Sequence, residues 1–174
     1  MIYSFDGREP KLESGTYVSE TATLIGDVRI GNNCYIGHGA VLLADQGTIE
    51  IGDGSAVEEA VVIHPPALGK CRIGKKVTVG HGAIIHARWI GDNATIGMGA
   101  VIGIAAKVGE GSIITENSVI RMNREIRAGV VARGNPAKVI REVSRKDLDF
   151  WILGKAYYIE MVKKYLGLGI TRIG

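Results

Sequence analysis

The chain has 174 residues, of which 46% are hydrophobic, and a formal net charge of +3. No apolar run approaches the roughly 20 residues of a membrane-spanning helix, and the basic residues are scattered, so we expect neither a membrane span nor nucleic-acid binding. The sequence has two cysteines and no secretory signal segment, which predicts a soluble protein in a reducing, cytoplasmic compartment.

Aliphatic residues recur every six positions along nearly the whole chain. They are Val18, Leu24, Ile30, Ile36 and Leu42; Ile51, Val57 and Ile63; Ile73, Val79 and Ile85; and Ile90, Ile96, Ile102, Val108, Ile114, Ile120 and Ile126. Such a repeat is too short for paired helices and is typical of a parallel β-helix, whose coils bury an apolar stripe by stacking. We therefore predict a mainly β fold, with a β-helix domain over residues 1–143.

A second periodicity indicates that the interior of this β-helix is narrow. The residue four positions after an anchor is small, as at Ala40, Ala94, Ala100, Ala106, Ser112 and Ser118. Cys34 and Cys71 occupy the same phase, where a thiol acts as a small apolar side chain. We therefore expect buried packing thiols rather than a redox pair.

The six-residue period gains extra residues at two places. Nine positions separate Leu42 from Ile51, and ten separate Ile63 from Ile73. The extra residues predict excursions at Asp45 to Gly47 and at Pro65 to Lys70. Functional sites often lie on loops that a rigid scaffold holds in place.

Three of the four histidines lie near the second of these places. His64 and His86 each directly follow an anchor, and the 22 positions between them equal one 18-residue coil plus the four-residue loop excess. Adjacent coils lie about 4.8 Å apart, so these imidazoles should stack closely enough to bind one metal ion. His81 has a different phase, but in a cyclic trimer it could complete a three-histidine site from a neighbouring subunit. A purely structural role is the alternative, and for His38, which shares the phase of His81 two coils earlier, it is the role that we predict.

The segment after GNPAKVIREVS carries apolar residues three or four positions apart. They are Leu148, Ile152, Ala156, Ile159, Val162 and Leu166. This spacing predicts an amphipathic α-helix within residues 144–174. Its apolar face should pack on the flank of the β-helix or on a neighbouring subunit.

Several segments resemble the gamma-class carbonic anhydrases and their relatives formerly described as ferripyochelin-binding proteins. They are VLLADQGTIEIGD, VVIHPP, GHGAIIH, IGMGA and GNPAKV, followed by AYYIEMVKKYL. The resemblance implies a left-handed β-helix and a homotrimer. It also implies that His64 and His86 of one subunit and His81 of its neighbour hold zinc, with iron(II) or cobalt as alternatives. The implied reaction is the reversible hydration of carbon dioxide to bicarbonate by a metal-bound hydroxide.

Three departures from the family pattern surround the predicted site. Leu43 stands where the family usually has an arginine that pairs with the aspartate corresponding to Asp45 across the subunit interface. Glu58 and Glu59 replace glutamine and aspartate, and Pro65–Lys70 lacks the acidic proton-shuttling loop of the best-studied members. We take Asp45, Glu58 and Glu59 as candidate catalytic residues. Glu58 is the candidate general base near the metal-bound water, with an exposed structural glutamate as the alternative.

Other activities fit the same pattern. A metal-dependent hydratase or thioesterase acting on an acyl-CoA or another carbonyl compound is favoured by Leu43 and Glu58, because leucine makes the pocket less polar. A hexapeptide-repeat acyltransferase would use one histidine as a base rather than three as ligands. A noncatalytic metal-binding scaffold is consistent with the missing arginine and shuttle. Hydration of carbon dioxide is the leading hypothesis.

Overall fold

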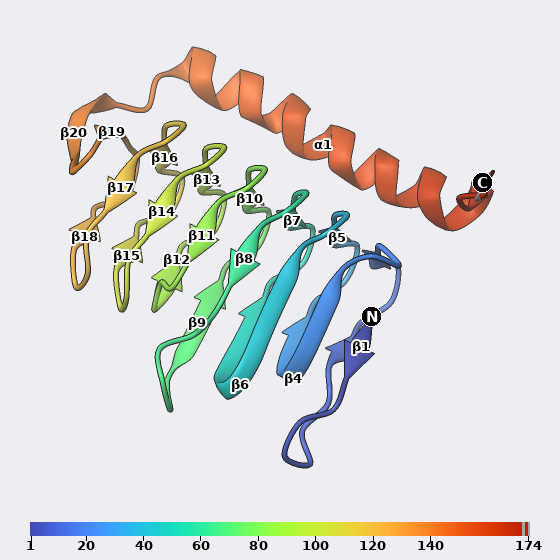
Figure 1. Cartoon of the computed structure of the whole chain (residues 1–174). Helices are drawn as coiled ribbons and strands as arrows, with labels where there is room; N and C mark the ends of the chain where they lie inside the picture. Colours follow the sequence, from blue (N-terminus) through green and yellow to red (C-terminus); the bar gives the residue numbers. More distant parts are fainter. Residues whose placement is uncertain (172, 174) are drawn as a thin grey trace.

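The computed structural model describes residues 1–171 and residue 173. The chain forms a left-handed parallel β-helix of about seven turns, with one α-helix alongside it (Figure 1). This confirms the predicted fold class. Each full coil contributes a short strand to each of three flat faces, and strands of successive coils pair in parallel.

The first face carries the strands on which α1 lies. They are β3 (Tyr17–Val18), β5 (Tyr35–Ile36), β7 (Ala56–Val57), β10 (Thr78–Val79), β13 (Thr95–Ile96), β16 (Ile113–Ile114) and β19 (Val130–Gly134), with antiparallel β20 (Ala137–Glu142) at the end. The second face contains β8 (Val62–Ile63), β11 (Ile84–Ile85), β14 (Val101–Ile102) and β17 (Val119–Ile120). The third contains β9 (Lys70–Ile73), β12 (Trp89–Ile90), β15 (Lys107–Val108) and β18 (Glu125–Ile126).

Two long strands, β4 (Thr23–Ile30) and β6 (Val41–Ile51), run through both the second and the third face, and β1 (Ile2–Tyr3) and β2 (Lys11–Leu12) pair with β4. The expected excursion at Asp45 to Gly47 is therefore wrong, because these residues lie inside β6. The extra residues are absorbed by a register shift between β4 and β6 that directly follows Gly26. Gly26 has φ of +78°, and a Cβ there would lie 2.3 Å from the carbonyl oxygen of Ala44, so close pairing requires glycine.

The second predicted excursion is confirmed. Residues 64–69 leave the strands between β8 and β9, and Lys70 is already the first residue of β9. The backbone N–H of Leu68 donates to the carbonyl oxygen of Gln46 at 2.7 Å, which attaches the loop to β6. The Leu68 side chain is 96% exposed.

The interior is filled as the periodicity predicts. The anchors of the clearest run are at most 7% exposed: Ile90, Ile96, Ile102, Val108, Ile114, Ile120 and Ile126. The small residues between them are fully buried: Ala94, Ala100, Ala106, Ser112 and Ser118. Cys34 and Cys71 are free and buried, and burial raises the pKa of the Cys71 thiol to about 12. Both thiols therefore act as apolar packing groups.

Helix α1 (Arg145–Leu168) begins with a capping box. The Ser144 hydroxyl accepts the backbone N–H of Asp147, and the Asp147 carboxylate accepts the backbone N–H of Ser144 at 2.8 Å. These two bonds satisfy donors that the first turn of a helix leaves unpaired. The N-terminus of α1 is therefore defined by the local sequence.

The face of α1 that packs on the β-helix differs from the predicted apolar stripe. Val162 is buried as expected, but Leu148, Ile152 and Leu166 are exposed. The half-buried residues that recur with Val162 are Trp151, Lys155, Tyr158 and Tyr165. The prediction scored only aliphatic residues, whereas tyrosine rings and a lysine stem also cover apolar surface.

Lys155 connects the middle of α1 to the first face of the β-helix. Its Nζ donates to the carbonyl oxygen of Ala94 at 3.1 Å, and it lies 3.3 Å from Thr95 Oγ1 and 3.4 Å from Thr78 Oγ1. Burial lowers the pKa of Lys155 to about 8, against the weaker opposing effect of the Glu58 carboxylate. The ammonium is hydrogen-bonded, but its charge is poorly solvated.

This contact predicts a pH-dependent stability. Below pH 8 both the folded and the unfolded chain hold the Lys155 proton, whereas above it the folded chain releases a proton that the unfolded chain keeps until near pH 10.5. The free energy of unfolding should therefore rise, relative to that of Lys155→Met, by about 2 kcal/mol between about pH 8 and 9.5. Urea unfolding of both proteins across this range measures the difference. Parallel pH profiles would contradict it.

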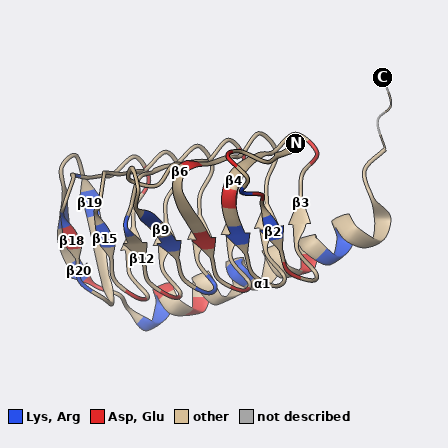
Figure 2. Ribbon diagram, turned by 90° about the horizontal axis from the view of Figure 1, so that it is seen from below, with Lys and Arg blue, Asp and Glu red and all other residues tan. Residues whose placement is uncertain are grey.

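The outer surface carries charges of both signs. Figure 2 shows lysine and arginine interspersed with aspartate and glutamate along the strands and α1. Pairs such as Lys70 with Glu50 and Lys107 with Glu125 bridge neighbouring coils. Among the described residues, no helix is both long enough and apolar enough to cross a membrane.

Candidate metal centre

His64 and His86 lie one above the other on adjacent coils, as their spacing predicts. Each directly follows a strand of the second face, and β8 and β11 pair with Ile63 opposite Ile85. The ring centroids are 5.1 Å apart, with the planes nearly perpendicular. Two imidazoles in this arrangement can turn toward a common ligand.

The surroundings of His86 favour its neutral imidazole. Burial, and then the neighbouring His64, lower the pKa of His86. A metal binds imidazole through an unprotonated nitrogen, so a lowered pKa keeps the ligand form available at neutral pH. His64 Nε2 lies 3.2 Å from Asp45 Oδ1. One predicted catalytic carboxylate thus lies next to the histidine pair.

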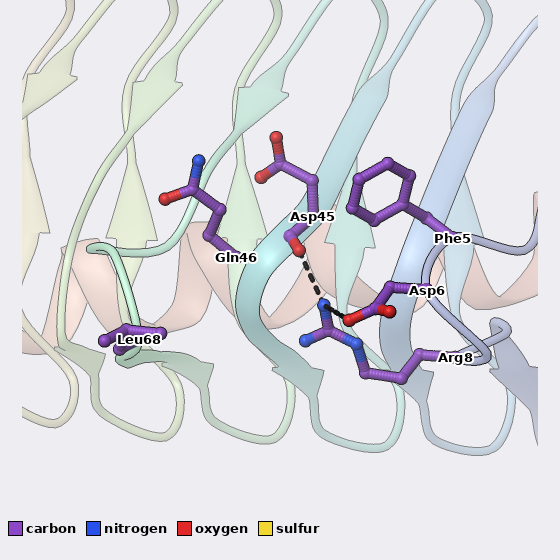
Figure 3. Close-up of a pocket in the computed structure, with 6 residues that line it drawn as sticks. All are labelled: Phe5, Asp6, Arg8, Asp45, Gln46 and Leu68. Atoms are coloured by element: carbon purple, nitrogen blue, oxygen red, sulfur yellow. Dashed lines mark hydrogen bonds and ion pairs between the residues drawn. The ribbon is translucent and has the colours of Figure 1, made fainter.

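Asp45 has partners although the usual arginine is absent. Its carboxylate contacts His64, and its backbone carbonyl oxygen accepts a 2.7 Å hydrogen bond from the Arg8 guanidinium, which also lies 3.6 Å from Asp6 (Figure 3). Asp45 thus has contacts within its own chain, with His64 through its carboxylate and with Arg8 through its backbone. Sequence periodicity could not detect Arg8, because it lies in the N-terminal segment before the repeats begin.

A cavity of about 790 Å³ opens beside Asp45. It is lined by Phe5, Asp6, Arg8, Asp45, Gln46 and Leu68 (Figure 3). The walls combine charged groups with the exposed side chains of Phe5 and Leu68. The space next to the Asp45 backbone can therefore accept a molecule much larger than carbon dioxide.

His81 belongs to a second cluster, formed with Glu58 and Glu59. Its Nε2 lies 3.1 Å from Glu58 Oε2 and its Nδ1 lies 2.7 Å from Glu59 Oε2, while its backbone N–H donates to Glu58 at 3.0 Å. Glu58 is only 6% exposed, so the interpretation of Glu58 as an exposed surface glutamate is wrong. A buried carboxylate next to an imidazole can hold or accept a proton.

Two tyrosines that the sequence analysis did not single out support these carboxylates. The Tyr35 hydroxyl donates to Glu59 Oε1 at 2.6 Å, and Tyr158 of α1 lies close to Glu58. Burial, followed by the adjacent carboxylate, raises the pKa of each tyrosine far above 10. Burial also disfavours the charged form of Glu59, but the hydrogen bonds from Tyr35 and His81 outweigh it and lower the pKa of Glu59. Tyr35 therefore acts as a donor to a charged Glu59 carboxylate.

His38 has the packing role that was predicted for it. Its Nδ1 lies 2.7 Å from Ser19 Oγ and 3.3 Å from Thr21 Oγ1, and its ring is 6.2 Å from that of Tyr165. The Ala60 backbone N–H donates to the His38 carbonyl oxygen, which places His38 two coils before His81. These contacts link successive coils and α1.

The two clusters lie at different corners of the β-helix. His81 and its carboxylates follow strands of the first face, whereas His64 and His86 follow strands of the second. Within the described residues of one chain, no group of three histidine, cysteine, aspartate or glutamate side chains has an arrangement that could hold a metal ion. The donor set still fits zinc, because each corner presents imidazole with an adjacent carboxylate that can orient it.

Comparisons with known proteins agree with this fold. The family model of the bacterial transferase hexapeptide (six repeats) matches residues 9–44. The model of the hexapeptide repeat of succinyl-transferase matches three segments, residues 27–65, 71–103 and 89–123. A carbonic anhydrase of Geobacillus kaustophilus is 31% identical over 97% of this chain and 92% of its own length. The carnitine operon protein CaiE of a Proteus species is 34% identical over 86% and 76%.

Solved structures include the same architecture. A putative acetyltransferase of Bacillus cereus superimposes with a TM-score of 0.93 at 32% identity, over 96% of this chain and 97% of its own. The relatives therefore include proteins named for different activities. What they share with this chain is the repeat, over almost its full length. The chain belongs to the hexapeptide-repeat family that includes the gamma-class carbonic anhydrases.

Proposed function

We propose that the chain is a gamma carbonic anhydrase-like enzyme that hydrates carbon dioxide to bicarbonate at the interfaces of a cytoplasmic homotrimer. His64 and His86 of one subunit and His81 of its neighbour hold zinc, with iron(II) or cobalt as alternatives. The observation that carries the proposal is the division of the histidines between two corners, each backed by a carboxylate. A threefold assembly can bring two unlike corners together at every interface.

Each residue of the two clusters has a distinct role. When bound, zinc supplies Lewis acidity and a hydroxide nucleophile at neutral pH. Glu59 orients His81 through Nδ1, and the Tyr35 hydroxyl holds Glu59 in place. Glu58, buried against His81 Nε2, accepts a proton at its carboxylate. Asp45 faces His64 Nε2 from the opposite half of the site, where it can orient that ring.

A second candidate is hydration or hydrolysis of a larger carbonyl compound, such as an acyl-CoA, by the same centre. The cavity beside Asp45 supports it, because about 790 Å³ lined partly by Phe5 and Leu68 exceeds what carbon dioxide needs. Leu43, half-buried on the same strand, adds apolar surface where the family resemblance implies arginine. The loop of residues 64–69 also contains no carboxylate that could carry protons away.

Parallel assays separate the two candidates. The protein, purified without oxygen and loaded separately with zinc, cobalt or iron(II), should hydrate carbon dioxide, and this activity should be lost in His86→Ala. Metal binding at about one ion per chain without hydration would reject the first candidate. Metal-dependent turnover of acyl-CoA thioesters would then establish the second. An activity that persists after complete metal removal would contradict both.

A further inference from the structure

A crevice separate from the histidine clusters runs between α1 and the first face of the β-helix. Its volume is about 310 Å³, at the lower end of the range for sites that hold small organic ligands. Its lining includes Glu110, Ile113, Leu148, Trp151, Ile152 and Lys155. In Figure 1 the N-terminal half of α1 crosses the first-face coils of β16, β13 and β10.

The two ends of the crevice differ in charge. At one end, the carboxylate of Asp147 bonds Arg141 and the guanidinium of Arg145 lies 3.0 Å from Asp149, so these charges are already paired. At the other end, the Lys155 Nζ contacts a carbonyl and two hydroxyl oxygens, and no carboxylate of the described residues lies within 4.0 Å of it. The inner end thus holds a half-buried ammonium with no carboxylate in direct contact, and the Glu58 carboxylate only partly opposes the lowering of its pKa by burial.

The rest of the lining is largely apolar, with one further carboxylate, that of Glu110. Trp151, Leu148 and Ile152 come from successive turns of α1, and Ile113 faces them from β16. Leu148 and Ile152 remain substantially exposed although they border a pocket. An aliphatic chain placed here would cover apolar surface, and a carboxylate at its inner end would neutralise Lys155.

We propose that this crevice is a binding site for a small amphipathic carboxylate, a medium-length aliphatic acid whose anionic end contacts Lys155. The charge of Lys155 and the apolar walls select an acid over the matching alcohol. A bound carboxylate stabilises the Lys155 ammonium and so raises the Lys155 pKa, which burial lowers. The lining of the crevice includes none of the residues assigned to the metal centre.

Fluorescence titration can test the site because the sequence has two tryptophans, Trp89 and Trp151. In a Trp89→Phe background, all tryptophan emission reports on Trp151. Octanoate should bind saturably and at least about ten-fold more tightly than 1-octanol. Lys155→Met should remove the preference for the acid while keeping the weak binding of the alcohol. The proposal would be overturned if Lys155→Met kept the preference for octanoate that the parent protein shows, or if the parent protein did not bind octanoate saturably.

A second variant guards against misfolding at Lys155. Ile152 is 60% exposed, so Ile152→Asp should fold normally while placing a negative charge on the crevice wall. It should weaken the binding of octanoate more than that of octanol. Leu153→Asp is the matched control, because Leu153 is the next residue of α1, is 73% exposed and does not line the crevice. If the two variants weakened the binding of octanoate equally, octanoate would not bind in the crevice.

Discussion

Mixing His81→Ala subunits with His64→Ala subunits is expected to restore metal binding that neither variant has alone. In a mixed trimer, one interface combines the intact His64 and His86 of the first variant with the intact His81 of the second. Random assembly from equal amounts gives mixed trimers in three quarters of cases, and each mixed trimer has one intact interface of three. The whole mixture should therefore hold about one quarter of the wild-type metal, and the isolated mixed trimers about one third. Co-expression with two affinity tags and elemental analysis of the doubly tagged species measures this.

The matched control mixes His64→Ala with His86→Ala subunits. These two side chains lie on adjacent coils of the same chain, 5.1 Å apart, and follow strands of the same face. No interface of that mixture contains an intact pair, so the metal content should stay at the background of the single variants. Recovery in the control would show that His64 and His86 do not act together. No recovery in the first mixture would reject the shared site.

Glu58→Gln should lower the rate of carbon dioxide hydration by about 100-fold at neutral pH, because an amide cannot accept the proton that the Glu58 carboxylate is proposed to take. Its shape, and an oxygen that can accept the backbone N–H of His81, are kept. Metal content should therefore stay unchanged. Stopped-flow hydration assays on metal-loaded protein measure the rate.

This substitution discriminates sharply, because the resemblance to the gamma-class family implies glutamine at this position. If Glu58→Gln were as active as the parent or more active, the carboxylate would be only an orienting group, and the general-base role would be wrong. Glu116→Gln is a suitable control, since Glu116 is exposed and lies outside both histidine clusters. It should leave the rate unchanged.

The fold was predictable because one local rule applies on every coil. An aliphatic residue every six positions must be buried, and the small residues between the anchors fit the narrow interior of a β-helix. The same rule predicted the stacking of His64 on His86 and the separate position of His81. It failed for Asp45 to Gly47, because two adjacent long strands can absorb extra residues through a register shift instead of a loop.

The contacts that complete the candidate site could not be predicted from the period. Arg8 lies before the repeats, and Tyr158 comes from α1, whose packing face is defined by tyrosines and a lysine rather than by aliphatic residues. Their positions depend on how non-repeating segments fold back onto the β-helix. Burial of Glu58 beneath Tyr158 likewise depends on this tertiary packing, because glutamate is usually exposed.

Native mass spectrometry of the anaerobically purified, metal-loaded protein tests the central claim most directly, because it reports the metal content of each oligomeric species separately. The shared site predicts trimers that carry about three metal ions and monomers that carry none. His81→Ala should form metal-free trimers. Monomers that retain stoichiometric metal, or trimers of the parent protein that bind none, would contradict a metal centre built from two subunits.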